Sequence, residues 1–138
     1  MGWGPVWVGI GGYHHLPLAV LWDQRDAAQL HTPRGWSTKL AWLVQRAYHG
    51  EVTFAGHSLE DGLPLYPQAR YALQARSTPT LLAVDPNDAG VTQAYPDPSW
   101  SLFVGGITIP HAGCYQLDAR WKGGAWRIIF AAGTVALS

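Results

Sequence analysis

Residues 110–132 read PHAGCYQLDARWKGGAWRIIFAA, and this stretch decides the fold class. Apolar and polar side chains alternate over residues 115–121, and the alternation resumes over residues 126–132. A period of two places one apolar row on one face of an extended strand. Gly123 and Gly124 supply a short turn between the two runs. The stretch therefore predicts a β-hairpin that closes the chain.

Similar short runs recur along the rest of the chain, with Gly, Pro, Asn and Asp between them. The expected strands fall within residues 6–10, 39–45, 51–55, 70–76, 80–84 and 99–109. Parallel strands would need long crossovers, which this spacing does not provide. We therefore expect an all-β chain that forms a single antiparallel β-sandwich of about eight or nine strands. Residues 23–31 have the one helix-friendly composition, so at most one short helix is expected.

The 39–45 run shows how the two faces are assigned. Leu40, Trp42 and Val44 form one row and are expected to face the core. The opposite row contains Lys39, Ala41, Leu43 and Gln45. In the next strand, Val52 and Phe54 are expected on the inner row.

The chain has 138 residues, which is a common size for one domain. Residues 18–138 are expected to form the sandwich domain, and residues 1–17 an N-terminal arm or edge strand. An arm of this kind can pair with the sheet edge of its own chain or of a neighbour. Self-association is therefore a hypothesis, with Trp3, Val6, Val8 and Ile10 as the contact residues.

Charge is low and balanced. Charged residues make up 13% of the chain, and nine Lys and Arg balance nine Asp and Glu. Nucleic-acid binders normally carry a basic excess, so this balance argues against DNA or RNA as a partner. A net charge of zero also removes long-range self-repulsion. The partner that we expect is therefore a protein, and in particular a second copy of the chain.

No run of 18 apolar residues occurs, so no membrane span is expected. The first ten residues lack the basic start and the long apolar stretch of a signal peptide. The low charge and the strand-rich pattern nevertheless favour an extracellular or cell-surface location.

Tryptophan is abundant, with eight residues in the chain. Most of them are expected to fill the core, because indole rings bury a large apolar area. Trp36 and Trp100 stand in loop-like sequence beside Gly35 and Pro98. They are therefore the candidates for exposed rings that stack on a glycan.

Three features resemble an immunoglobulin-like sandwich. Trp42 lies in a mid-chain strand, residues 110–115 lead into a late strand, and the 115–132 hairpin closes the chain. More narrowly, Gly-Cys-Tyr after a proline, followed by an alternating strand that ends in Trp, is similar to the C-terminal part of bacterial extracytoplasmic proteins with Ig-like domains. Two features depart from antibody domains: Cys114 is the only cysteine, and Tyr115 follows it directly. The resemblance implies a fold and no activity.

Two short motifs superficially match catalytic or metal-binding patterns. Residues 56–60 read Gly-His-Ser-Leu-Glu, but a nucleophile elbow needs glycine where Glu60 stands. Residues 85–90 share three positions with a calcium loop, but Pro96 stands where an EF-hand has its glutamate. We expect a strand end at the first motif and a turn at the second.

The six histidines show none of the His-x-His or His-Glu-x-x-His spacings of metal sites. A metal site assembled from distant loops is an alternative that the sequence leaves open. Cys114 is expected to be a small buried residue at a strand start. No catalytic residue, cofactor or metal ligand is therefore assigned.

The sequence thus predicts a non-enzymatic structural or interaction module, self-associating through its N-terminal arm. A carbohydrate-binding module that uses Trp36 and Trp100 is the first alternative. An enzyme with a loop-built metal site is the second.

Overall fold

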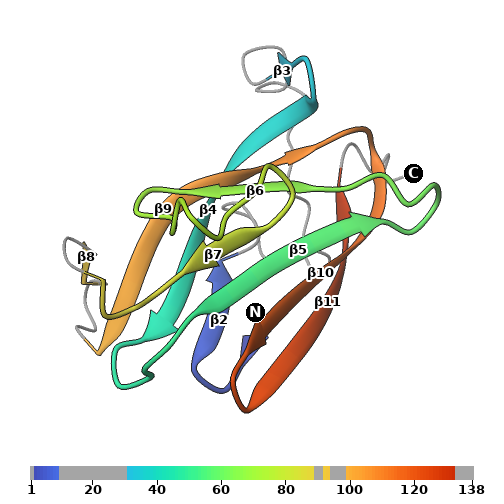
Figure 1. Ribbon diagram of the computed structural model, residues 1–138. Coiled ribbons are helices and arrows are strands. Elements are labelled where there is room, and N and C mark those ends of the chain that lie inside the picture. The colour runs from blue at the N-terminus through green and yellow to red at the C-terminus, as the bar shows by residue number, and fades with distance from the viewer. Residues whose placement is uncertain (1, 10–30, 89–91, 94–98, 133–138) are drawn as a thin grey trace.

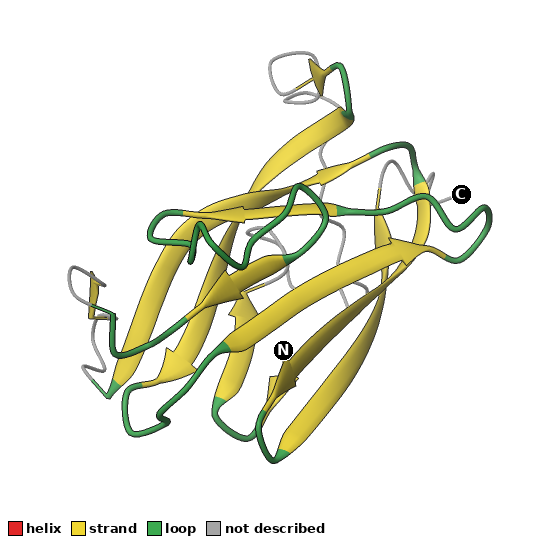
Figure 2. Cartoon of the chain, viewed as in Figure 1, coloured by secondary structure: helices red, strands yellow, loops and turns green. Residues whose placement is uncertain are grey.

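The computed structural model describes residues 2–9, 31–88, 92–93 and 99–132. These residues form two antiparallel sheets that lie face to face, a β-sandwich-like architecture (Figure 1). The described residues contain strands, turns and loops and no helix (Figure 2). The all-β prediction is confirmed.

The larger sheet, sheet A, has seven strands in the order β1-β2-β4-β9-β6, with β3 paired to β4 and β8 to β9. Its strands are β1 (Gly2–Trp3), β2 (Val6–Gly9), β3 (His31–Thr32), β4 (Gly35–Gln45), β6 (Tyr66–Ala69), β8 (Thr92–Gln93) and β9 (Trp100–Ile109).

The smaller sheet, sheet B, has four strands in the order β11-β10-β5-β7. They are β5 (Val52–Ser58), β7 (Leu82–Val84), β10 (Gly113–Trp121) and β11 (Gly124–Ala132). The chain crosses between the sheets after β4, β5, β6, β7 and β9.

The C-terminal hairpin forms as the alternation predicts. Strands β10 and β11 pair from Gly113 with Ala132 to Trp121 with Gly124, which leaves a two-residue turn. Gly123 has a φ of 101° in this turn. That backbone conformation is strained for residues with a side chain, so a glycine is favoured there.

The core lies between the two sheets and contains the rows that the alternation predicts. Leu40, Trp42 and Val44 of β4 are buried, and so are Val52 and Phe54 of β5. The ring centroids of Trp42 and Phe54 lie 4.5 Å apart, which joins the sheets at the centre. The hairpin side chains that complete this core are Tyr115, Leu117, Ala119, Trp126, Ile128, Phe130 and Ala132.

A second contact joins the sheets at their edge. The indole N–H of Trp126 in β11 donates to the carbonyl oxygen of Val6 in β2 at 2.8 Å. A buried indole needs such an acceptor for its N–H. The contact fixes the N-terminal hairpin β1–β2 against sheet B.

Two local predictions differ from the structure. Residues 70–76 form turns instead of a strand, and Tyr71 has a φ of 61°. The alternating residues Tyr71, Leu73 and Ala75 form no buried row, because Tyr71 and Ala75 are exposed, and it is Ala72 that packs on the core. The predicted helix at residues 23–31 lies outside the described residues except for His31, which begins β3.

Eleven strands are described, more than the eight or nine expected. Three of them, β1, β3 and β8, have only two residues each. Such short pairings carry no alternation, so the sequence does not reveal them. In the described part of the chain, no helix has the length and apolarity needed to cross a membrane.

Candidate functional site

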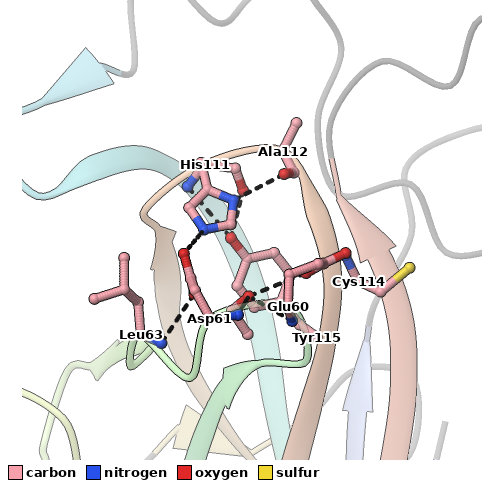
Figure 3. A network of polar contacts seen from close by, with 8 residues as sticks. Glu60, Asp61, Leu63, His111, Ala112, Cys114 and Tyr115 are labelled. Carbon is pink, nitrogen blue, oxygen red and sulfur yellow. Dashed lines mark hydrogen bonds and ion pairs between the residues drawn. The ribbon is translucent and has the colours of Figure 1, made fainter.

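A network of polar side chains joins two crossovers at one end of the sandwich (Figure 3). The loop after β5 supplies Glu60 and Asp61, and the turn after β9 supplies His111. Nε2 of His111 lies 2.7 Å from Oδ2 of Asp61. Glu60 makes a second link between the two segments: its Oε1 accepts a hydrogen bond from the backbone N–H of Cys114 at 2.9 Å.

Both ring nitrogens of His111 face acceptors. Nδ1 lies 2.8 Å from the carbonyl oxygen of Ala112, and Nε2 faces the carboxylate of Asp61. A neutral imidazole donates from one nitrogen only, whereas the protonated ring donates from both. The Ala112 carbonyl and the Asp61 carboxylate therefore raise the pKa of His111 above its usual 6.5.

The two carboxylates are held in their charged forms. The Cys114 amide and the Ser58 hydroxyl, which donates at 3.0 Å, lower the pKa of Glu60. The amide of Leu63 donates to Asp61 at 3.1 Å and lowers the pKa of that side chain. Hydrogen bonds to a carboxylate favour its ionised form.

Tyr115 completes the network from β10. Its hydroxyl donates to the carbonyl oxygen of His111 and accepts from the His111 amide at 3.3 Å. Burial raises the pKa of this phenol, so it remains a neutral donor. Tyr115 thereby fixes the backbone of the turn that carries the imidazole.

These hydrogen bonds join the loop after β5 to the segment between β9 and β10, and we call Glu60, Asp61 and His111 with their partners the polar clamp. Each nitrogen of His111 is engaged, and the Ser58 hydroxyl donates to Glu60. Figure 3 shows the thiol of Cys114 pointing away from the imidazole, so the two groups do not form a nucleophile–base pair. Cys114 is exposed, contrary to the prediction of burial. It lies on the outward row of β10, whereas Tyr115 takes the inward position.

Stability is expected to depend on pH through this clamp. A raised histidine pKa adds stability that is complete below 6.5 and is lost as the pH rises through the folded value. Lowered carboxyl pKa values add stability above 4.5 for Glu60 and 3.8 for Asp61, which is lost as the pH falls. We therefore expect the melting temperature to be highest between about pH 4.5 and 6.5, by a small margin because the groups are exposed.

Thermal melts of the wild type and of His111→Gln between pH 4 and 9 test this expectation. In the variant, the melting temperature should no longer fall as the pH rises above 6.5. His49→Gln is the matched control, because the His49 ring contacts the neutral amide of Asn87. An unchanged alkaline decline in His111→Gln would contradict the assignment.

The first motif, residues 56–60, is the end of β5 followed by the start of a turn, and residues 86–88 of the second motif form a turn. Ser58 ends β5, and its hydroxyl accepts from the Glu60 amide at 3.2 Å. The Asp85 carboxylate accepts from the Asn87 amide at 2.9 Å, as in an Asx turn. Among the described residues, no group of three or more His, Cys, Asp or Glu side chains could hold a metal ion.

The two predicted glycan-stacking residues lie apart. Trp36 pairs with Ile109 at one end of the β4–β9 ladder, and Trp100 pairs with Gln45 at the other end. Trp36 is half-buried on the inward row of β4. The two indole rings therefore do not form one surface.

The predicted arm residues belong largely to the fold of their own chain. Val6 and Val8 are buried in the core, and β2 pairs with β4. Trp3 is 54% exposed and packs edge to face on Trp121, with centroids 5.2 Å apart. Ile10 lies outside the described residues.

The outer face of sheet A carries apolar side chains that the sequence analysis did not assign to a site. Trp7 pairs with Leu43, and Leu43 pairs with Leu102, so three outward residues lie side by side across β2, β4 and β9. Val104 follows on β9 and is 51% exposed. Trp7 also packs edge to face on Trp100, at 6.4 Å. The signal for this surface in the sequence is Leu43, a large apolar residue on the row of residues 39–45 that is expected to face away from the core.

A cleft that is lined by four polar side chains and by apolar surface adjoins this apolar row on the same face. It has a volume of about 500 Å³ and spans β4, β9 and β6. Its polar side chains are Ser37, Lys39, Gln68 and Arg70, and Val104 borders it on the apolar side. The outer face of sheet A thus combines an apolar half with a hydrogen-bonding half.

Charge on this sheet has one sign. None of its strands contains Asp or Glu, and their one charged residue is Lys39. Arg34, Arg46 and Arg70 lie directly beside strand ends of the same sheet. The zero net charge of the chain therefore conceals a positive sheet A.

No protein-family model, curated protein or solved structure matches this chain.

Proposed function

We propose that the chain is a non-enzymatic interaction module that binds through the outer face of sheet A. The carrying observation is the row of Trp7, Leu43 and Leu102 with Val104 beside it on three paired strands: Trp7 and Val104 are exposed, and the two leucines are half-buried. Contiguous exposed apolar surface is typical of binding faces. The positive cleft that adjoins this row favours a ligand with acidic groups next to apolar surface.

A second copy of the chain is disfavoured as a partner through sheet A, but is favoured as a partner through the N-terminal arm. A symmetric pair through this face would place Lys39 and Arg70 against a surface whose strands hold no carboxylate. Burying charges without partners costs free energy, which disfavours that arrangement. Self-association through the N-terminal arm is the second candidate function, and the exposed Trp3 and Trp7 favour it. Exchange of the arm between copies would require β2 to leave β4.

We also propose the immunoglobulin-like type of sandwich and an extracellular or cell-surface location. Trp42 in a mid-chain strand and the hairpin that closes the chain support the first proposal, and the low charge and the strand-rich pattern support the second.

The substitution Val104→Asp tests the proposed binding face, because it places a carboxylate on an acid-free surface. On arrays of neutral, carboxylated and sulfated glycans and of acidic peptides that contain aromatic residues, we expect the wild type to bind one class. Val104→Asp should weaken that binding about tenfold. A residue at the centre of an interface contributes roughly 1 kcal/mol or more to binding. The measurement is a titration of the bound probe with each variant.

Ile129→Asp is the matched control, because Ile129 is 52% exposed on sheet B and Val104 is 51% exposed on sheet A. Equal effects of the two substitutions, or no binding to any probe, would contradict the proposal. Sedimentation separates the second candidate: self-association that persists in Val104→Asp uses the arm.

A further inference from the structure

The cleft on sheet A has an ordered arrangement that follows from strand register. Lys39 pairs with Gly106, and Gly106 pairs with Gln68, so three outward positions lie in one row across β4, β9 and β6. One row further along β9, the Arg70 amide donates to the Val104 carbonyl at 2.9 Å. Gly106 is the middle residue of this row, between Lys39 and Gln68.

Gly106 lines the cleft and adds no side chain to it. Gly106 has a negative φ, which any residue adopts, so backbone conformation does not require glycine there. A glycine in a strand interior often marks the close approach of a ligand or of another backbone. Side chains around it border the opening: Lys39 and Gln68 in the same row, with Ser37 and Arg70 at its corners.

The two cations of the cleft have no carboxylate partner among the described residues. The ion pairs of that part of the chain join Arg76 to Glu51, His111 to Asp61 and Arg127 to Asp118. No Asp or Glu lines the cleft. A third cation, Arg34, lies 4.8 Å above the ring of Tyr66, which occupies the neighbouring row. This surface is therefore complementary to an anion.

Resting on the proposed binding face, we propose that the cleft holds a carboxylate or sulfate group carried by an acidic carbohydrate. Lys39 and Arg70 only donate hydrogen bonds and suit the anionic oxygens. Ser37 and Gln68 both donate and accept, which suits sugar hydroxyl groups. The neighbouring Val104 and the apolar row receive the apolar face of the next sugar ring.

The position of the cleft disfavours an acidic peptide as the ligand. Residue 106 is paired on both sides, to β4 and to β6, so the strand beneath the opening offers no free edge to an added strand. A peptide would contact this face through side chains alone. A carbohydrate brings hydroxyl groups on every ring and uses the Ser37 and Gln68 side chains as well as the cations.

Binding of four defined polymers tests the inference by isothermal titration: polygalacturonate, dextran sulfate, neutral dextran and poly-L-glutamate. We expect one or both anionic polysaccharides to bind, and the neutral dextran not to bind. Lys39→Gln and Arg70→Gln should each weaken that binding about tenfold, because hydrogen bonds to charged groups are strong. Both side chains are exposed, so the variants should fold.

Arg120→Gln is the matched control, because Arg120 is an exposed cation on sheet B. Equal weakening by this control, or equal binding of dextran, would overturn the inference. Poly-L-glutamate binding as tightly as the polysaccharides would overturn the carbohydrate class and leave the proposed binding face intact. If Val104→Asp abolished binding while Lys39→Gln and Arg70→Gln had no effect, the cleft would not be the anion site, and the proposed binding face of sheet A would stand.

Discussion

Replacement of Trp42 by alanine is expected to lower the free energy of unfolding by about 3–5 kcal/mol. Trp42 is fully buried, and its ring lies 4.5 Å from that of Phe54 in the opposite sheet. The substitution removes this contact and leaves a cavity at the centre of the core. It also removes the indole N–H that donates to the Gln68 carbonyl at 3.0 Å.

Urea unfolding followed by far-ultraviolet circular dichroism measures this loss. Trp42→Phe should lower the free energy of unfolding by less than Trp42→Ala, because an aromatic ring remains in the core. Some loss is still expected, because phenylalanine cannot donate to the Gln68 carbonyl. Trp3→Ala is the surface control, since Trp3 is 54% exposed, and its loss should stay within about 1.5 kcal/mol. A loss in Trp42→Ala no larger than that in Trp3→Ala would show that Trp42 is not central to the core.

Gly105→Ala is expected to lower the free energy of unfolding by about 1–3 kcal/mol. A Cβ atom at residue 105 would lie 1.9 Å from the carbonyl oxygen of Gln68 and 2.6 Å from Cα of Ala69. Both are backbone atoms of β6, so the strand itself must move to relieve the contact. The same Gln68 carbonyl accepts from Trp42, and the effects of the two substitutions should therefore not be additive.

Amide hydrogen exchange adds a local measurement to the unfolding experiment. The Arg70 amide, which bonds to Val104 across the same strand pair, should exchange faster in Gly105→Ala. Gly9→Ala is the control in the same sheet, because its Cβ would lie at an ordinary 3.4 Å from that of Ala41. A stability equal to that of Gly9→Ala would contradict the close approach of β6.

The register of β6 also links stability to the proposed binding site. Gln68 and Arg70 line the cleft, and Gly105 sets how closely their strand lies to β9. Displacement of β6 would move both side chains relative to Lys39. Adjacent glycines thus differ in place: Gly105 admits the neighbouring backbone, and Gly106 lines the cleft without a side chain.

The polar clamp shows which contacts sequence analysis could not find. Asp61 and His111 lie 50 residues apart, and Glu60 and Cys114 lie 54 residues apart. No spacing rule relates residues at such separations, because the loops that carry them are brought together only by the tertiary arrangement of the two sheets. From the sequence alone, residues 56–60 are expected to end a strand, and residues 110–115, which include His111, to lead into one.

The binding face shows a different limit. Lys39, Ala41 and Leu43 were correctly placed on the outward row of β4, but their neighbours on β2, β9 and β6 were unknown. Trp100 was singled out because Pro98 and Ser99 precede it, and it lies on this face beside Trp7. Trp36, which follows Gly35 and has the same loop-like sequence context, lies on the inward row.

Alternating hydrophobicity alone predicted that the chain is all-β, which side chains of β4, β5 and the final hairpin face the core, and where that hairpin turns. These properties are local, because a strand's two faces follow from the geometry of consecutive residues. Tertiary structure decided the rest: the order of strands, the row of residues through Gly106 and the polar clamp. Such features depend on pairing between distant segments, and a period of two is compatible with many registers.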